Sequence, residues 1–138
     1  PLFARRYPLT PPHHVLVVDD HDEGRGAVAA FLAKKGFGVG VVADSNTAYG
    51  ALISGPEPSV VILDLMTPVR SAPELLYLMQ RSSRLSEIPV ILLDDHQLMP
   101  EFRYRMPVCL LDKPYEPEGL LAALERCVHL RAQRANAD

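Results

Sequence analysis

Apolar residues gather in five short runs, separated by stretches of mixed character. Each run is rich in Val, Ile and Leu and shows little alternation between apolar and polar positions. The runs occupy residues 14–18, 37–42, 59–63, 89–93 and 108–111. A strand of a parallel sheet is covered on both faces, so its sequence is apolar throughout. The pattern therefore predicts five buried strands of one parallel sheet.

Between these runs, apolar residues recur with the period of a helix. Helices are expected at residues 22–36, 45–54, 71–80 and 116–131. Gly36 is of the residue type that commonly ends a helix. Ser71 and Glu74 have the spacing of a capping box at a helix start. Pro117 suits the first turn of the last helix, because that position needs no backbone N–H.

Strands and helices alternate along the chain, and this alternation predicts an α/β fold. The expected architecture is a single doubly wound five-stranded parallel sheet with helices on both faces. The helix before the fifth strand falls in residues 94–107, where Pro100 and weak periodicity predict a short or irregular element. One domain is expected over residues 13–132, between a Pro-rich tail at 1–12 and a C-terminal tail at 133–138.

The charge and composition narrow the classes of function. A formal net charge of −3 argues against a nucleic-acid or anionic-membrane partner. No apolar run reaches the ~20 residues that cross a bilayer, and no signal-peptide core precedes the first strand. A cytoplasmic protein is therefore expected. Cys109 and Cys127 form neither a disulfide framework nor a CxxC metal pair, so two free thiols are expected.

Acidic residues follow the predicted strands at the edge where such folds place their sites. Asp19 and Asp20 end the first strand, Asp64 ends the third, and Lys113 follows the fifth. Converging carboxylates repel one another unless a hard cation such as Mg²⁺ joins them. A lysine opposite them can balance the charge of a phosphoryl group, and an aspartate can attack phosphorus to give an acyl phosphate.

Four motifs in this order resemble the receiver domain of two-component response regulators. They are VLVVDDHDE, VVILDLMTP, IPVILL and LDKPY. The resemblance covers roughly residues 14–131 and implies a flavodoxin-like receiver fold. It also implies a signalling module, not an enzyme beyond its own phosphorylation. The expected partners are a histidine kinase or phosphotransfer protein and an output protein or domain.

The resemblance assigns roles to individual residues. It makes Asp64 the phosphoacceptor and Lys113 the contact to the phosphoryl group. It places Mg²⁺ or Mn²⁺ on Asp19, Asp20, Asp64 and the backbone carbonyl of Met66. By contrast, His21 and His96 each follow an acidic pair, yet solvent-exposed loop histidines are expected at both positions in preference to metal ligands.

The switch positions depart from the family pattern. Asp94 and Asp95 stand where the family has a hydroxyl residue and a small residue, and Leu110 replaces the aromatic partner. An ionised carboxylate cannot donate a hydrogen bond. Against a phosphoryl charge of about −2, an added charge about 4 Å away costs several kcal/mol at an effective dielectric near 20. The sequence therefore predicts an atypical receiver whose hydroxyl-and-aromatic relay cannot operate.

Other interpretations of the same residues stay open. Asp94 could pair with Lys113 and fix one conformation, which would make the domain a phosphorylation-independent interaction module. A haloacid-dehalogenase-type phosphatase is disfavoured, because Met66 stands where its general acid would be. A flavodoxin-like cofactor binder is disfavoured by the acidic first loop, residues 19–26.

The assembly of the protein is less constrained by the sequence. The chain ends soon after the last predicted helix, which fits either a single-domain regulator or a receiver taken from a longer protein. A homodimer is compatible with the resemblance. It is not predicted, because the family's usual dimer face of fourth helix, fifth strand and last helix is altered here.

Overall fold

The sheet has five parallel strands in the order β2-β1-β3-β4-β5. A computed structural model describes residues 13–21, 26–64, 68–94, 108–113 and 115–137, with only the backbone at 68–71, 94 and 130–137. The strands are β1 (His14–Asp19), β2 (Gly38–Val42), β3 (Val60–Asp64), β4 (Val90–Asp94) and β5 (Val108–Asp112). This arrangement confirms the predicted α/β class and the five parallel strands. The predicted burial holds for β1, β3 and β4 and is wrong for β2 and β5, which are partly exposed because they lie at the edges of the sheet.

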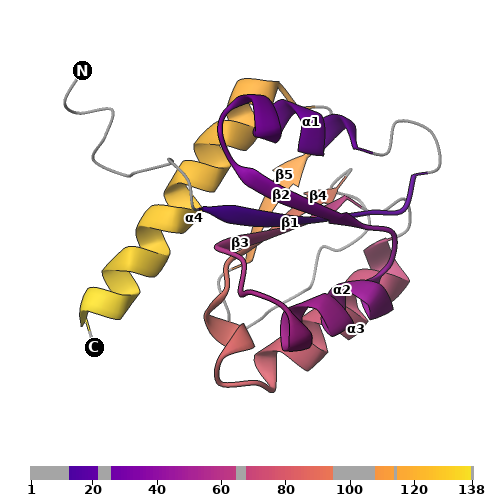
Figure 1. Ribbon diagram of the computed structural model, residues 1–138, viewed down its shortest axis with the longest axis vertical. Coiled ribbons are helices and arrows are strands. Elements are labelled where there is room, and N and C mark those ends of the chain that lie inside the picture. Colours follow the sequence, from indigo (N-terminus) through magenta and orange to yellow (C-terminus); the bar gives the residue numbers. More distant parts are fainter. Residues whose placement is uncertain (1–12, 22–25, 65–67, 95–107, 114, 138) are drawn as a thin grey trace.

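Helices cover both faces of the sheet. They are α1 (Ala27–Lys34), α2 (Ser45–Ser54), α3 (Pro68–Gln80) and α4 (Pro117–Ala137), with a 3₁₀ turn η2 (Leu85–Glu87). Figure 1 shows α2 and α3 together below the sheet, whereas α1 and α4 lie on its other side. The fold is therefore the doubly wound sandwich that the alternating pattern predicts.

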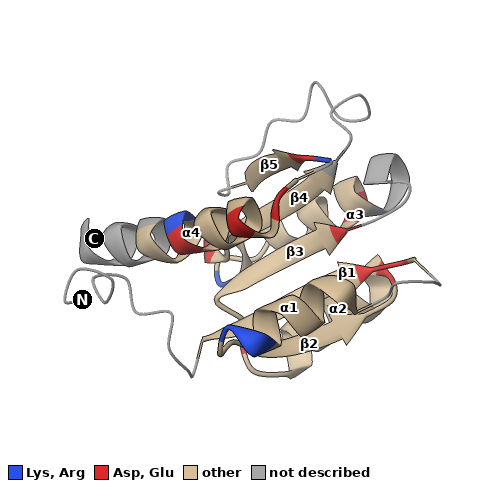
Figure 2. Cartoon of the chain, turned by 90° about the horizontal axis from the view of Figure 1, so that it is seen from above, with Lys and Arg blue, Asp and Glu red and all other residues tan. Residues whose placement is uncertain are grey.

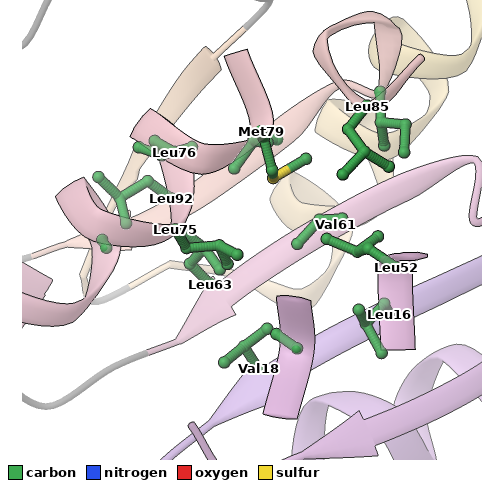
Figure 3. Close-up of a cluster of buried hydrophobic side chains, with 14 residues drawn as sticks. Leu16, Val18, Leu52, Val61, Leu63, Leu75, Leu76, Met79, Leu85 and Leu92 are labelled. Atoms are coloured by element: carbon green, nitrogen blue, oxygen red, sulfur yellow. The ribbon is translucent and has the colours of Figure 1, made fainter. Parts of the chain in front are cut away.

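The two faces of the sheet have separate apolar cores. Along β3, Val61 and Leu63 pack toward α2 and α3, whereas Val60 and Ile62 pack toward α1 and α4. Figure 3 shows the first of these cores, in which Leu75 of α3 lies beside Leu63 of β3 and Leu52 of α2 lies near Leu16 of β1. Successive strand residues point to opposite faces, so a strand covered on both sides must be apolar throughout.

Some helix ends differ from the sequence prediction. The prediction of a capping box at Ser71 and Glu74 was wrong, because α3 begins at Pro68 and Ser71 lies within the helix. Proline suits a first helical position, where a missing N–H has no intrahelical partner to lose. The last helix continues past the predicted residue 131 to Ala137, since Ala, Gln and Arg in this segment favour a helix. The predicted glycine stop is confirmed at Gly36, which has φ +99° and follows α1.

Several predictions lie outside the described residues. They concern the N-terminal tail at 1–12, the irregular helix at 95–107, and the site residues Met66, Asp95 and His96. The division of the chain at residues 13 and 132 stays a prediction. None of the helices in the described ranges has the length and apolar character that a membrane crossing requires.

Candidate functional site

Acidic residues meet at the carboxyl ends of two neighbouring strands. Asp19 on β1 and Asp64 on β3 are register partners, and Asp20 directly follows β1. Figure 2 shows acidic segments at the tips of both strands. The prediction that these acids converge therefore holds, and its cause is the parallel pairing of β1 with β3.

Asp19 is held in place by backbone donors. Its side chain is buried, with the residue only 2% exposed. Oδ1 accepts a hydrogen bond from the His21 backbone N–H at 3.0 Å, and Oδ2 accepts one from the Gly26 N–H at 3.4 Å. Two backbone N–H donors fix the orientation of the acceptor carboxylate. The loop after β1 therefore fixes a buried negative charge at the sheet edge.

His21 turns toward the acidic pair. Its Nδ1 lies 2.8 Å from Asp19 Oδ1 and 3.8 Å from Asp20 Oδ1. One ligand atom from each of these three residues lies within 4.8 Å of the others. The side chain is 31% exposed, so the expected loop histidine is only partly exposed. The position of His21 directly after the acidic pair is evident from the sequence. The direction of its imidazole ring could not be predicted, because it depends on the backbone conformation after β1.

Asp64 and Lys113 form an ion pair. The Nζ atom of Lys113 lies 2.7 Å from Asp64 Oδ1. That oxygen is buried and accepts no well-aligned hydrogen bond from any described residue. Lys113 follows β5, two strands from β3 and so about 10 Å away, and its long side chain spans the difference. The one cation of the predicted site thus faces the acid that ends β3.

The switch positions are described in part. The backbone register places Asp94 opposite Asp112 at the ends of β4 and β5. The side chain of Asp94 lies outside the description, so its predicted pairing with Lys113 stays a prediction. Leu110 lies on β5 and is 54% exposed, an unusual exposure for a leucine in a parallel strand.

Tyr115 lies near Asp64 and Asp19. It ends the motif LDKPY, but no role was predicted for it from the sequence. Burial raises the pKa of its phenol, and the negative charges of Asp64 and Asp19 raise that pKa further. It also borders an apolar pocket between α1 and the start of α4, beside Phe31 and Leu120. The phenol therefore stays protonated and can donate a hydrogen bond near the acids.

The acidic side chains at this edge offer the oxygen ligands that a divalent cation needs. Asp19 and Asp64 are buried carboxylates and Asp20 is half-buried, which supplies oxygen ligands from two adjacent strand ends. The Asp64 Oδ1 atom keeps capacity to accept a ligand or hydrogen bond. Several carboxylate oxygens at one edge of the sheet are the ligands that Mg²⁺ takes, so the residues present fit this ion.

Comparison with known proteins identifies one family. The model of the response regulator receiver domain matches residues 15–125. Two-component response regulator ORR11 of Oryza sativa subsp. indica is 34% identical over 87 residues, which are 63% of this chain and 59% of the rice protein. The chain thus spans about three fifths of the length of that relative.

Solved structures agree on the fold. Chemotaxis response regulator CheY4 of Vibrio cholerae has a TM-score of 0.72 and 27% identity, over 83% of this chain and 98% of that chain. The receiver domain of sensor histidine kinase PA1611 from Pseudomonas aeruginosa, solved with magnesium in its active site cleft, also has a TM-score of 0.72. It is 20% identical over 85% of this chain and 98% of that chain.

Proposed function

This chain belongs to the response regulator receiver family of two-component signalling, and on that premise we propose that Asp64 is its phosphoacceptor. Receiver domains are signalling modules, and residues 13–132 would form this one. The observation that carries the proposal is the 2.7 Å ion pair between Asp64 and Lys113, beside a second buried acid, Asp19. The phosphoryl donor would be a phosphohistidine of a histidine kinase or phosphotransfer protein in the cytoplasm.

The transfer chemistry follows from the positions of the side chains. A carboxylate oxygen of Asp64 forms a bond to phosphorus while the bond from phosphorus to the donor histidine breaks, and the histidine nitrogen takes up a proton. Lys113 Nζ then moves its contact from the carboxylate to a phosphoryl oxygen, which carries the larger charge. The domain modifies only itself, and no further enzymatic activity is proposed.

The metal site would use the acids of β1 and β3. Asp19, Asp20 and Asp64, with the backbone carbonyl of Met66, would hold Mg²⁺ or Mn²⁺. The buried Asp64 Oδ1 atom without a well-aligned donor supports this proposal, as does the magnesium bound by the similar PA1611 receiver. When bound, the cation would lower the repulsion between these carboxylates and the incoming phosphoryl oxygens.

The response to phosphorylation would differ from that of a family member with a hydroxyl switch. Asp94 and Asp95 offer acceptors only, and Leu110 cannot fill the place of an aromatic partner. The exposure of Leu110 on β5 supports this part of the proposal, because the side chain is not packed into a switch pocket. Any output protein or domain would therefore respond to a conformational change on phosphorylation that does not use a hydroxyl and an aromatic side chain.

The test is the intact mass of the protein after incubation with acetyl phosphate and Mg²⁺. One phosphoryl adduct is expected, and it should be lost in Asp64→Asn. Glu118→Gln changes an exposed acid at the start of α4 and should keep the adduct. No adduct, from a folded protein and with a standard receiver labelled alongside, would overturn the proposal. The domain would then be the phosphorylation-independent interaction module.

A further inference from the structure

The two cysteines of the chain lie in direct contact. Cys109 is on β5 and Cys127 is on α4, and their Sγ atoms are 3.8 Å apart. Both belong to the apolar core between the sheet and α4. Sequence predicted two free thiols, and both are free. It could not predict the contact, because the two residues are eighteen positions apart and lie on different elements, β5 and α4.

We propose that Cys109 and Cys127 form a reversible intramolecular disulfide when the protein meets hydrogen peroxide. A disulfide has sulfurs about 2.05 Å apart, so the two atoms must approach by about 1.8 Å. At van der Waals contact no other group lies between the sulfurs. This modification site does not depend on the proposed phosphorylation of Asp64.

The two thiols have unequal environments that suit successive steps. Cys109 is partly exposed and Cys127 is buried, so an oxidant in solution reaches Cys109 first. The hydrogen bond from the Cys127 thiol lowers the pKa of Cys109, and the nearby Arg126 lowers it further. The same hydrogen bond, with burial, raises the pKa of Cys127. Cys109 is thus the thiolate that reacts with peroxide, and Cys127 is the resolving thiol.

The reaction balances with peroxide as the only oxidant. The Cys109 thiolate attacks one peroxide oxygen, the O–O bond breaks, and with one proton the products are a sulfenic acid and water. The Cys127 sulfur then attacks the Cys109 sulfur, and the S–O bond breaks. The released hydroxyl leaves as water with the Cys127 proton. Two thiols are oxidised to one disulfide while one peroxide is reduced to two waters.

The bond would join the edge strand of the sheet to the helix that covers it. The disulfide would hold β5 against α4. Lys113 directly follows β5, so its position would be restrained as well. Cross-linking removes freedom from the unfolded chain, and the oxidised form should melt at a higher temperature than the reduced form.

The test is thiol counting and intact mass of the full chain after treatment with dilute hydrogen peroxide. Both thiols should be lost together, the mass should fall by two hydrogens, no disulfide should link two molecules, and dithiothreitol should reverse the change. Peptide mapping should give one cross-linked pair that contains Cys109 and Cys127. In Cys127→Ala, which keeps a small apolar side chain in the core, peroxide should convert Cys109 to a sulfenic acid, and dimedone should bond to its sulfur with loss of water.

Each other outcome of the experiment would overturn the proposal. Retention of both thiols would show that the contact does not react. A wild-type product that carries added oxygen, or a disulfide between two molecules, would show that Cys127 does not resolve Cys109. A loss of thiols only above the melting temperature would assign the reaction to the unfolded chain.

Discussion

Lys113 reaches Asp64 across an intervening strand, with 2.7 Å between Nζ and Oδ1. The two residues follow β5 and β3, and β4 lies between these strands in the sheet. A lysine side chain is long enough to cross the end of one strand. The residue that it reaches, Asp64, is buried, with only 8% of its surface exposed. The pair therefore joins the last strand of the sheet to its centre. It is the contact that phosphorylation or metal binding would first change.

Replacement of Lys113 should separate metal binding from phosphoryl transfer. In Lys113→Met the positive charge beside Asp64 is lost, and Mg²⁺ should bind at least about tenfold more tightly, because like charges a few ångströms apart cost several kcal/mol. Phosphoryl transfer should slow at least about tenfold, since the developing charge loses its cation. Tyr115 lies near the acids, and the chain has no Trp, so tyrosine fluorescence can follow the metal.

The control for this variant is Lys34→Met, at the exposed end of α1. It should leave both the affinity for Mg²⁺ and the rate of labelling unchanged. Equal Mg²⁺ affinity in Lys113→Met and the wild type would show that Lys113 stabilises the metal-free and the metal-bound protein equally. The predicted competition between Lys113 and the metal would then be wrong.

Replacement of Asp94 should raise phosphoryl occupancy. Asp94→Thr removes a negative charge from the end of β4 and supplies a hydroxyl donor. The fraction labelled at a fixed acetyl phosphate concentration should rise, with a rate at least about tenfold higher, because the repulsion of the phosphoryl group is relieved. Asp112→Asn is the matched control, since it removes the register partner's charge at the end of β5. Equal labelling of Asp94→Thr and the wild type would contradict the proposed repulsion.

Much of this fold could be predicted from sequence because the three central strands, β1, β3 and β4, are covered on both faces. In β3, apolar residues on both faces predicted both cores, and parallel pairing then brought Asp19 beside Asp64. Contacts between side chains on different elements that belong to no recognised motif could not be predicted, since they depend on strand order and side-chain direction. The contact of Cys109 with Cys127 is of this kind. The start of α3 was missed because two local signals, a proline and a capping box, compete there.

His21 should affect the choice of metal more than the affinity for magnesium. His21→Ala removes the imidazole nitrogen that lies 2.8 Å from Asp19 Oδ1. Binding of Zn²⁺ or Co²⁺ should weaken about tenfold, because imidazole suits these ions, whereas Mg²⁺ prefers oxygen and should change little. Titration calorimetry with each metal measures the difference. His129→Ala, on α4, is the control. An equal loss for Mg²⁺ and Zn²⁺ would show that His21 acts only by positioning Asp19.

Asp44 should stabilise the fold in a pH-dependent manner. It caps α2, where its carboxylate accepts the Thr47 N–H at 2.7 Å. This hydrogen bond lowers the pKa of Asp44 from 3.8. A lowered folded-state pKa gives stability that is present above the unfolded pKa and is lost as the pH falls through the lower folded value. Asp44→Ala should therefore lower the free energy of unfolding by about 1 kcal/mol at pH 7 and by less at about pH 3.

The control for the cap is Asp44→Asn, because asparagine caps a helix without a charge. Urea unfolding of both variants at the two pH values separates the two effects. Asp44→Asn should stay close to the wild type near pH 3 and fall slightly below it at pH 7. A constant difference between Asp44→Ala and the wild type across this range would show that the charge of Asp44 contributes nothing to the cap.

Restoring both switch residues should give more than the sum of the single changes. Leu110 is 54% exposed, so Leu110→Tyr alone should alter neither labelling nor stability by a measurable amount. The resemblance to the family implies that a hydroxyl residue moves toward the phosphoryl group and acts together with an aromatic partner. The double variant Asp94→Thr with Leu110→Tyr should therefore show a phosphorylation-dependent change in hydrogen exchange along β5 that neither single variant shows. If the change in hydrogen exchange in the double variant equals the sum of the changes in the single variants, positions 94 and 110 do not act together. The departures at Asp94 and Leu110 would then be independent of one another.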